Sequence, residues 1–150
     1  MARILAIDYG RKRVGLAVTD PLQIIANGLE TVSTTDVLDY LKKYLSKEQV
    51  EKIVVGLPKQ MNGEDSEMMK YIRPFVAQLQ KTFPDMEIVY VDERFTSVLA
   101  QRAMLDGGLK KKDRQNKALV DKISATIILQ SYLETKFQIS DSKFQISDLR

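Results

Sequence analysis

Short runs of consecutive apolar residues, of the length typical of buried strands, recur along the chain. The first, Ile4–Ile7, is followed by the polar turn Gly10–Arg13 and then by the apolar run Val14–Val18. Two such runs joined by a short turn that contains glycine are typical of a β-hairpin. We therefore expect a hairpin over residues 4–18, followed by a third short strand over residues 28–33.

Two later apolar runs, KIVVGLP (52–58) and EIVYV (87–91), are also predicted to be strands, and they alternate with segments of helical periodicity. Thr34 or Thr35 can cap the first helix through its hydroxyl oxygen. Pro74 removes a backbone donor inside the second helix and predicts a kink or a restart there. The expected helices cover residues 35–46, 66–83, 97–105 and 117–134.

This order of elements predicts a mixed α/β sheet. Right-handed crossovers would make the first, fourth and fifth strands parallel, with helices on both faces of the sheet. The carboxyl ends of these strands would then share one edge, where active sites of such sheets usually lie. That edge would collect Asp8, the loop that follows Gly56, and Asp92–Glu93.

The end of the chain contains a repeat, because residues 136–142 and 143–149 have nearly the same sequence. Phe137 and Ile139 alternate with polar residues, a period of two that is typical of a strand and not of a helix. We expect residues 1–135 to form one domain and residues 136–150 a mobile extension. An added edge strand and a self-association element are the alternatives.

The composition excludes several kinds of active site. The chain contains neither histidine nor cysteine, which rules out a Ser-His-Asp triad, a thiolate nucleophile and a His- or Cys-ligated zinc site. The absence of cysteine fits a reducing compartment, and we expect a cytoplasmic protein. No apolar run approaches the roughly 20 residues of a membrane helix, so no membrane association is expected. The net charge of +3 by itself gives little support for nucleic acid as a partner.

Three carboxylates carry the candidate chemistry. Asp8 and Glu93 each end a predicted buried strand, and Asp121 shares a helix stripe with Ala125 and Ile128 that should face the sheet. Oxygen ligands alone suit Mg²⁺ or Mn²⁺. Two such ions about 4 Å apart can activate a water and stabilise the leaving oxygen in phosphodiester cleavage. Without metal, the clustered acids would repel one another and one would keep its proton.

Each acid also has an ordinary structural interpretation. Asp8 can simply end a strand, and an acid in the first turns of a helix, such as Asp121, complements the helix dipole. Asp92 is a further candidate ligand, although strand alternation directs it away from the side of Glu93.

Basic residues flank these acids in the sequence. Some lie in the turn after the first strand and the others in the segment GGLKKKDRQNK, between Glu93 and Asp121. Such groups can follow a phosphate backbone, although a solvated connection is the alternative for the second cluster. The candidate phosphate-binding residues are Arg11, Lys12, Arg13, Lys110, Lys111, Lys112 and Arg114.

Four motifs, DYGRKRVGLAVTD, VVGLPKQMNG, VDERFTS and DKISATIILQ, together resemble those of the YqgF (RuvX-like) family. The resemblance covers residues 3–134 and implies an RNase H-like fold with a mixed five-stranded sheet flanked by helices on both faces. Members of this family are described as Holliday junction resolvases and as nucleases that mature the 5′ end of pre-16S rRNA.

The resemblance implies that Asp8, Glu93 and Asp121 are the catalytic, metal-binding acids. It also implies roles in organising the site or holding substrate phosphate for four further residues: Arg13, Arg94, Thr96 and Ser97. Many RNase H-like nucleases have an acid at the end of the fourth strand, where this chain has Gly56-Leu57-Pro58. Glu93 would take the place of that acid.

The leading hypothesis is a Mg²⁺- or Mn²⁺-dependent endonuclease that processes the 5′ end of pre-16S rRNA in ribosome biogenesis, with the small ribosomal subunit as a partner. A Holliday junction resolvase acting on branched DNA is an alternative, and it would need paired active sites and hence a homodimer instead of a monomer. A third possibility is an RNA-binding ribosome or transcription factor with little catalysis. A sugar-kinase or actin-like ATPase, whose first phosphate loop also follows a strand with D-x-G, would need a second domain of this kind.

Overall fold

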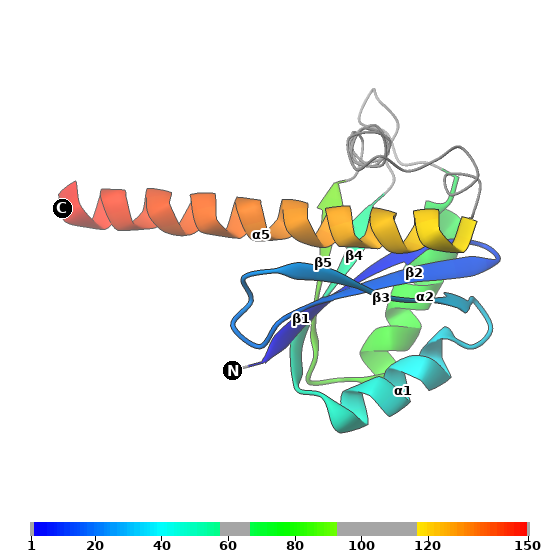
Figure 1. Ribbon diagram of the computed structural model, residues 1–150. Coiled ribbons are helices and arrows are strands. Elements are labelled where there is room, and N and C mark those ends of the chain that lie inside the picture. Colours follow the sequence, from blue (N-terminus) through cyan, green and yellow to red (C-terminus); the bar gives the residue numbers. More distant parts are fainter. Residues whose placement is uncertain (1, 58–66, 93–116, 150) are drawn as a thin grey trace.

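The computed structural model describes residues 2–57, 67–92 and 117–149, and its centre is one five-stranded sheet in the order β3-β2-β1-β4-β5 (Figure 1). The strands are β1 (Arg3–Tyr9), β2 (Arg13–Thr19), β3 (Ala26–Ser33), β4 (Val50–Leu57) and β5 (Glu87–Asp92). The helices are α1 (Val37–Lys47), α2 (Met69–Thr82) and α5 (Lys117–Leu149).

The pairing of the strands confirms the predicted mixed sheet. β1 runs antiparallel to β2, and β2 runs antiparallel to β3. β1 is parallel to β4, with Ile7 opposite Val55, and β4 is parallel to β5, with Leu57 opposite Asp92. The carboxyl ends of β1, β4 and β5 therefore meet at one edge, as the sequence predicted.

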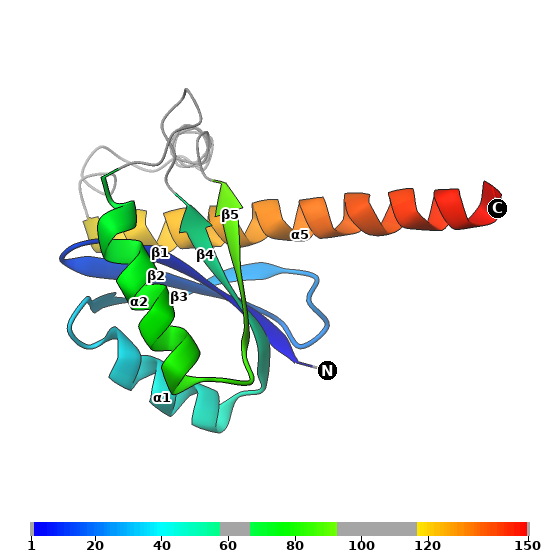
Figure 2. The same ribbon diagram turned by 180° about the vertical axis from the view of Figure 1, so that it is seen from behind.

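Helices cover both faces of the sheet, as Figures 1 and 2 show: α1 and α2 lie on one face and α5 crosses the other. Successive residues of β1 divide between two cores, because side chains alternate along a strand. Leu5 and Ile7 pack on the side of α1 and α2. Ile4 and Ala6 pack on the side of α5, and all four are fully buried. This double burial explains why β1 is a continuous apolar run in the sequence.

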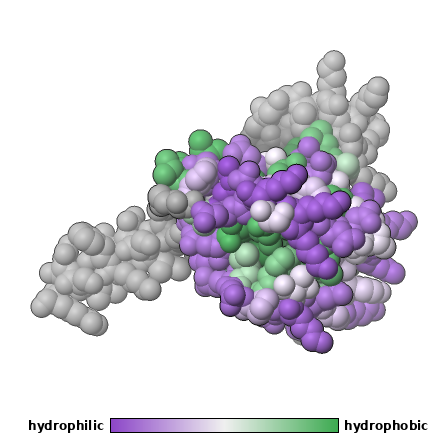
Figure 3. All heavy atoms as spheres, turned by 90° about the horizontal axis from the view of Figure 1, so that it is seen from below, coloured by the Kyte–Doolittle hydropathy of each residue, from purple (hydrophilic) through white to green (hydrophobic). Residues whose placement is uncertain are grey.

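The outer surface is largely polar. The face shown in Figure 3 is mostly hydrophilic, with one band of hydrophobic atoms near its centre. Within the described part of the chain, no helix combines the length and the hydropathy that crossing a membrane requires.

The prediction that a threonine caps the first helix was wrong. Asp36, and not a threonine, precedes α1, because the Thr34 hydroxyl donates to the Gly10 carbonyl at 2.7 Å and the Thr35 hydroxyl lies 2.8 Å from that of Ser33. The second helix continues through Pro74 without a restart. The apolar side chains of α2 stay on one face of the helix, and their burial offsets the missing backbone hydrogen bond.

The last helix is longer than the sequence predicted. α5 continues beyond residue 134 through the whole repeat to Leu149, so the interpretation of the repeat as non-helical was wrong. Adding residues to an existing helix avoids the cost of a new nucleus, which outweighs the period-two pattern of these few apolar residues. The side chains of α5 are described only as far as Glu134, and Leu133 is the last buried one among them.

Removing residues 136–150 is expected to leave the stability of the domain almost unchanged. The described core residues of α5 are Ala125, Ile128, Leu129 and Leu133, and the truncation removes none of them. The midpoint of thermal unfolding, measured by circular dichroism, should shift by less than about 2 °C. A much larger loss of stability would show that the repeat belongs to the folded domain.

Candidate active site

Asp8 lies near the carboxyl end of β1, opposite Gly15 of β2 in the antiparallel register. Burial, with a further contribution from the negative charge of Asp121, raises the pKa of the Asp8 carboxyl from 3.8 to about 7. Asp8 and Asp121, two of the three acids predicted to converge, are thus close enough to repel each other. The raised pKa of Asp8 is in the direction expected of such a pair without metal.

Asp121 reaches this position because α5 crosses β2 in very close contact at Gly15. A Cβ atom added to Gly15 would lie 2.6 Å from the carbonyl carbon of Asp121 and 3.2 Å from its Cβ. Only glycine leaves room for the helix backbone at this distance. The start of α5 is also fixed to β3, where the hydroxyl of Thr31 donates to the Ala118 carbonyl at 2.6 Å. The helix therefore places Asp121 over the residue that faces Asp8.

Arg13, at the start of β2, orients the second acid. Its Nε–H donates to Oδ2 of Asp121 at 2.8 Å, and both side chains are partly exposed, at 39% and 23% of their surface. An ion pair with this exposure contributes little to stability. It does fix one carboxylate oxygen of Asp121, which leaves the other oxygen available to a cation.

A hollow of about 550 Å³ opens directly beside this pair. It is lined by residues of the β1–β2 turn, by Met68 before α2 and by Asp121 itself. The turn contributes Gly10, Arg11, Lys12 and Arg13. An acid at one side, with Asp8 close to it, and cations around the rim are the charge distribution expected where a metal and a phosphate group bind together.

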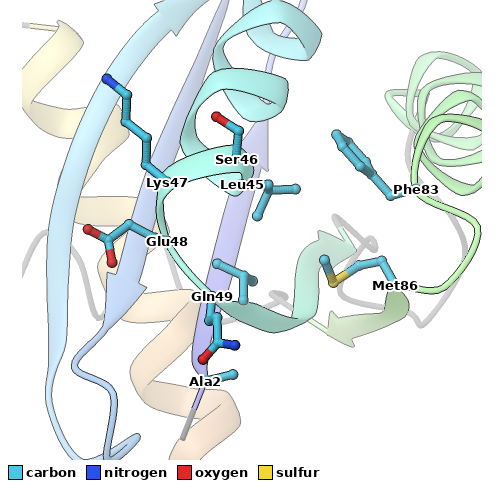
Figure 4. Close-up of a pocket in the computed structure, with 9 residues that line it drawn as sticks. Ala2, Leu45, Ser46, Lys47, Glu48, Gln49, Phe83 and Met86 are labelled. Atoms are coloured by element: carbon cyan, nitrogen blue, oxygen red, sulfur yellow. The ribbon is translucent and has the colours of Figure 1, made fainter.

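A second hollow, of about 460 Å³, lies at the opposite, amino edge of the parallel strands (Figure 4). Its wall combines Leu45, Phe83 and Met86 with the end of α1. The carboxylate in this wall, Glu48, forms an ion pair with Arg3 at 3.4 Å. Glu48 is the one acid among the described residues that line this hollow, so the candidate chemistry belongs to the carboxyl edge.

The residues of the carboxyl edge fit a hard divalent cation. Asp8 and Asp121 offer only carboxylate oxygens, and a cation between them would offset both the burial and the repulsion that raise the pKa of Asp8. The described residues contain no group of three possible ligands, so the structure brings together a pair and not a complete metal site. Asp92 ends β5 at the same edge of the sheet.

Of the predicted site residues, the structure describes five and brings them to one place: Asp8, Arg11, Lys12, Arg13 and Asp121. The other predicted residues lie outside the described residues and remain predictions. These are Glu93, Arg94, Thr96, Ser97, Lys110, Lys111, Lys112 and Arg114. The role of Gly15 was not predicted, although a glycine inside a strand is a known sign of a close approach.

Comparisons with known proteins show which family and which fold this chain shares. Residues 2–135 match the RuvX family model, described as Holliday junction resolvase. A protein of Phocaeicola vulgatus is 71% identical over 91% of this chain and 98% of its own length, and one of Bacteroides fragilis is 70% identical over 91% and 99%. Both carry the name "Putative pre-16S rRNA nuclease".

Among solved structures, RuvC of T. thermophilus in complex with a Holliday junction substrate has a similar fold. The TM-score is 0.52 and the sequence identity 15%, over 90% of this chain and 98% of that one. The RNase H-like α/β fold predicted from the sequence is thereby confirmed.

Replacing Gly15 by alanine is expected to disturb the acid pair by forcing α5 away from β2. The added methyl group meets helix backbone, and overpacking of this kind costs about 1–3 kcal/mol. The matched control is Gly28→Ala, whose methyl group would meet the flexible side chain of Lys122, with Cγ at 2.8 Å. Urea unfolding should show that Gly15→Ala lowers the free energy of unfolding more than Gly28→Ala does. We also expect Mg²⁺ to raise the melting temperature of the wild type but not that of Gly15→Ala. Equal effects of the two changes would contradict this account.

Asp8→Asn is expected to stabilise the metal-free protein at neutral and alkaline pH. Because the pKa of Asp8 is higher in the folded state, wild-type stability falls as pH rises from about 4 to about 7. A pKa unit corresponds to about 1.4 kcal/mol, so at pH 8 the variant should gain roughly 2–4 kcal/mol. Urea unfolding in EDTA at pH 4.5 and pH 8 measures the gap in free energy of unfolding between Asp8→Asn and the wild type. The exposed Asp85→Asn is the control. A gap that does not grow with pH would show that Asp8 is ionised without metal.

Proposed function

Because the chain belongs to the RuvX family of Holliday junction resolvases, we propose that it is a metal-dependent nuclease whose Asp8, Glu93 and Asp121 hold the catalytic cations. The observation that carries this proposal is the buried Asp8 carboxyl beside Asp121, whose pKa is raised first by burial and further by the negative charge of Asp121. A pair of acids held together at this cost is of use to a protein when a cation joins them.

The reaction supported by this site is hydrolysis of a phosphodiester bond. Mg²⁺ or Mn²⁺ at such a site supplies an activated water and stabilises the charge that develops on the phosphate. Oxygen of the water forms a bond to phosphorus, the bond from phosphorus to the leaving ribose or deoxyribose oxygen breaks, and that oxygen takes up a proton. Asp8 would give up its proton to act as a ligand beside Asp121, and Arg13 keeps Asp121 in position.

The basic turn supports a role in holding the substrate. Arg11 and Lys12 are exposed at the rim of the hollow, and Arg13 is shared between the rim and Asp121. Cations at the rim of the hollow that Asp121 lines can bind the phosphates next to the bond that is cut. We expect Arg94, Thr96, Ser97, Lys110, Lys111, Lys112 and Arg114 to contribute to the same surface.

The 5′ end of pre-16S rRNA is the proposed substrate, and ribosome biogenesis in the cytoplasm the proposed process. The names of relatives that are 70% and 71% identical to the chain support this choice. The small ribosomal subunit is then the natural partner, because it carries this RNA. A four-way DNA junction is the alternative substrate, which the family description favours and which would require a homodimer with paired sites.

Asp8→Asn and Asp121→Asn are each expected to reduce cleavage by more than about 100-fold, beyond the usual effect of losing an outer-shell partner of a metal. The assay compares an RNA that carries the unprocessed 5′ extension of 16S rRNA, free and within small subunits, with a four-way DNA junction. Mg²⁺ and Mn²⁺ are tested separately, and Asp85→Asn again controls for the loss of one negative charge.

Cleavage of the RNA by the wild type but by neither site variant supports the proposal. Cleavage of the junction alone would move the substrate to branched DNA. If wild type and variants bind RNA equally and none cleaves it, the chain is a binding module and the proposal fails.

A further inference from the structure

Two cations gather around one aromatic ring on α2, next to the acid pair. Cζ of Arg11, in the β1–β2 turn, lies 5.0 Å from the centroid of the Tyr71 ring. Nζ of Lys70 lies 5.4 Å from the same centroid. Among the described residues, neither cation has a carboxylate within ion-pair distance. This cluster of Arg11, Lys70 and Tyr71 was not predicted from the sequence.

The electrostatics of this cluster favour an anion. The ring attracts both cations, and each lies within 5.4 Å of its centroid. Within the described part of the chain, no carboxylate forms an ion pair with either cation. A phosphate group near both would supply the negative charge that balances them. Lys70 is exposed at the surface, so its ammonium group is accessible to a ligand.

The cluster has a fixed position relative to the active site. Met68, two residues before Lys70, lines the hollow that also contains Asp121. The rings of Tyr9, at the end of β1, and Phe75 of α2 stack with their centroids 4.4 Å apart. Phe75 follows Tyr71 by one helical turn, so this contact holds the same face of α2 against the strand that carries Asp8.

We propose that Lys70 and Tyr71, together with Arg11, form a phosphate-binding subsite for the nucleic-acid strand that enters beside Asp8 and Asp121. This inference rests on the proposed nuclease function and adds α2 as the second wall of the substrate groove, opposite the β1–β2 turn. Lys70 contacts a backbone phosphate, and Tyr71 positions the two cations. The recognised group is the phosphodiester, so the subsite contributes affinity without base specificity.

The test compares two charge reversals on one helix. Lys70→Glu removes the proposed contact. Lys81→Glu makes the same change of charge in the last turn of α2, about 16 Å away along the helix axis at 1.5 Å per residue. Both lysines are exposed, so both variants should fold. The probe is a fluorescein-labelled RNA that carries the extended 5′ end of 16S rRNA, and its dissociation constant is measured by anisotropy over a series of salt concentrations.

Lys70→Glu should weaken binding and reduce the slope of log K against log salt concentration by about one, the value for one lost phosphate contact. Lys81→Glu should leave the slope unchanged. Tyr71→Leu should weaken binding, whereas Tyr71→Phe, which keeps the ring, should bind as the wild type does. Circular dichroism of the Tyr71 variants establishes that they are folded.

Equal salt slopes and affinities for Lys70→Glu and Lys81→Glu would overturn the inference. All variants are made in the Asp8→Asn background, so binding is measured without cleavage and independently of catalysis. A position-specific loss at Lys70 therefore supports the subsite even if the wild type cleaves no substrate, a result that would refute only the proposed nuclease activity.

Discussion

The close contact between α5 and β2 at Gly15 is the constraint on which the rest of the site depends. Without a side chain at this position, the helix backbone can lie directly on the strand, and Asp121 is placed over the partner of Asp8. The result is two carboxylates in a partly desolvated place, one of which keeps its proton up to about pH 7. The fold therefore maintains an unfavourable charge arrangement that a divalent cation can convert into a favourable one.

The β1–β2 turn connects this arrangement to the surface around it. Arg13 turns toward α5 and bonds to Asp121, whereas Arg11 lies over Tyr71 of α2, on the other side of the sheet. One short hairpin thus joins the layer that carries the acids to the layer that carries the proposed phosphate subsite. The same division runs through β1, whose alternate residues pack against α5 and against α1 and α2.

Much of this could be predicted from the sequence, because its strongest signals are local. The buried runs of β1 and β4 are continuous apolar segments, and the stripe of Asp121, Ala125 and Ile128 directs the acid toward the sheet. The role of Gly15 depends on which helix crosses that strand, and the contact of Arg11 with Tyr71 joins residues 60 positions apart. Such contacts follow from tertiary packing, which local patterns do not determine. The extension of α5 through the repeat shows helix propagation prevailing over a short strand-like pattern.

The central claim is that Asp8 and Asp121 together form a site for a divalent cation, and Mn²⁺ binding tests it most directly. Electron paramagnetic resonance of free Mn²⁺, measured while the metal is titrated into the wild type at pH 7.5, gives the number and affinity of bound ions. The account predicts a saturable site that Mg²⁺ displaces and that is lost in both Asp8→Asn and Asp121→Asn, but not in Asp85→Asn. Mn²⁺ binding of unchanged affinity in the two site variants would contradict it.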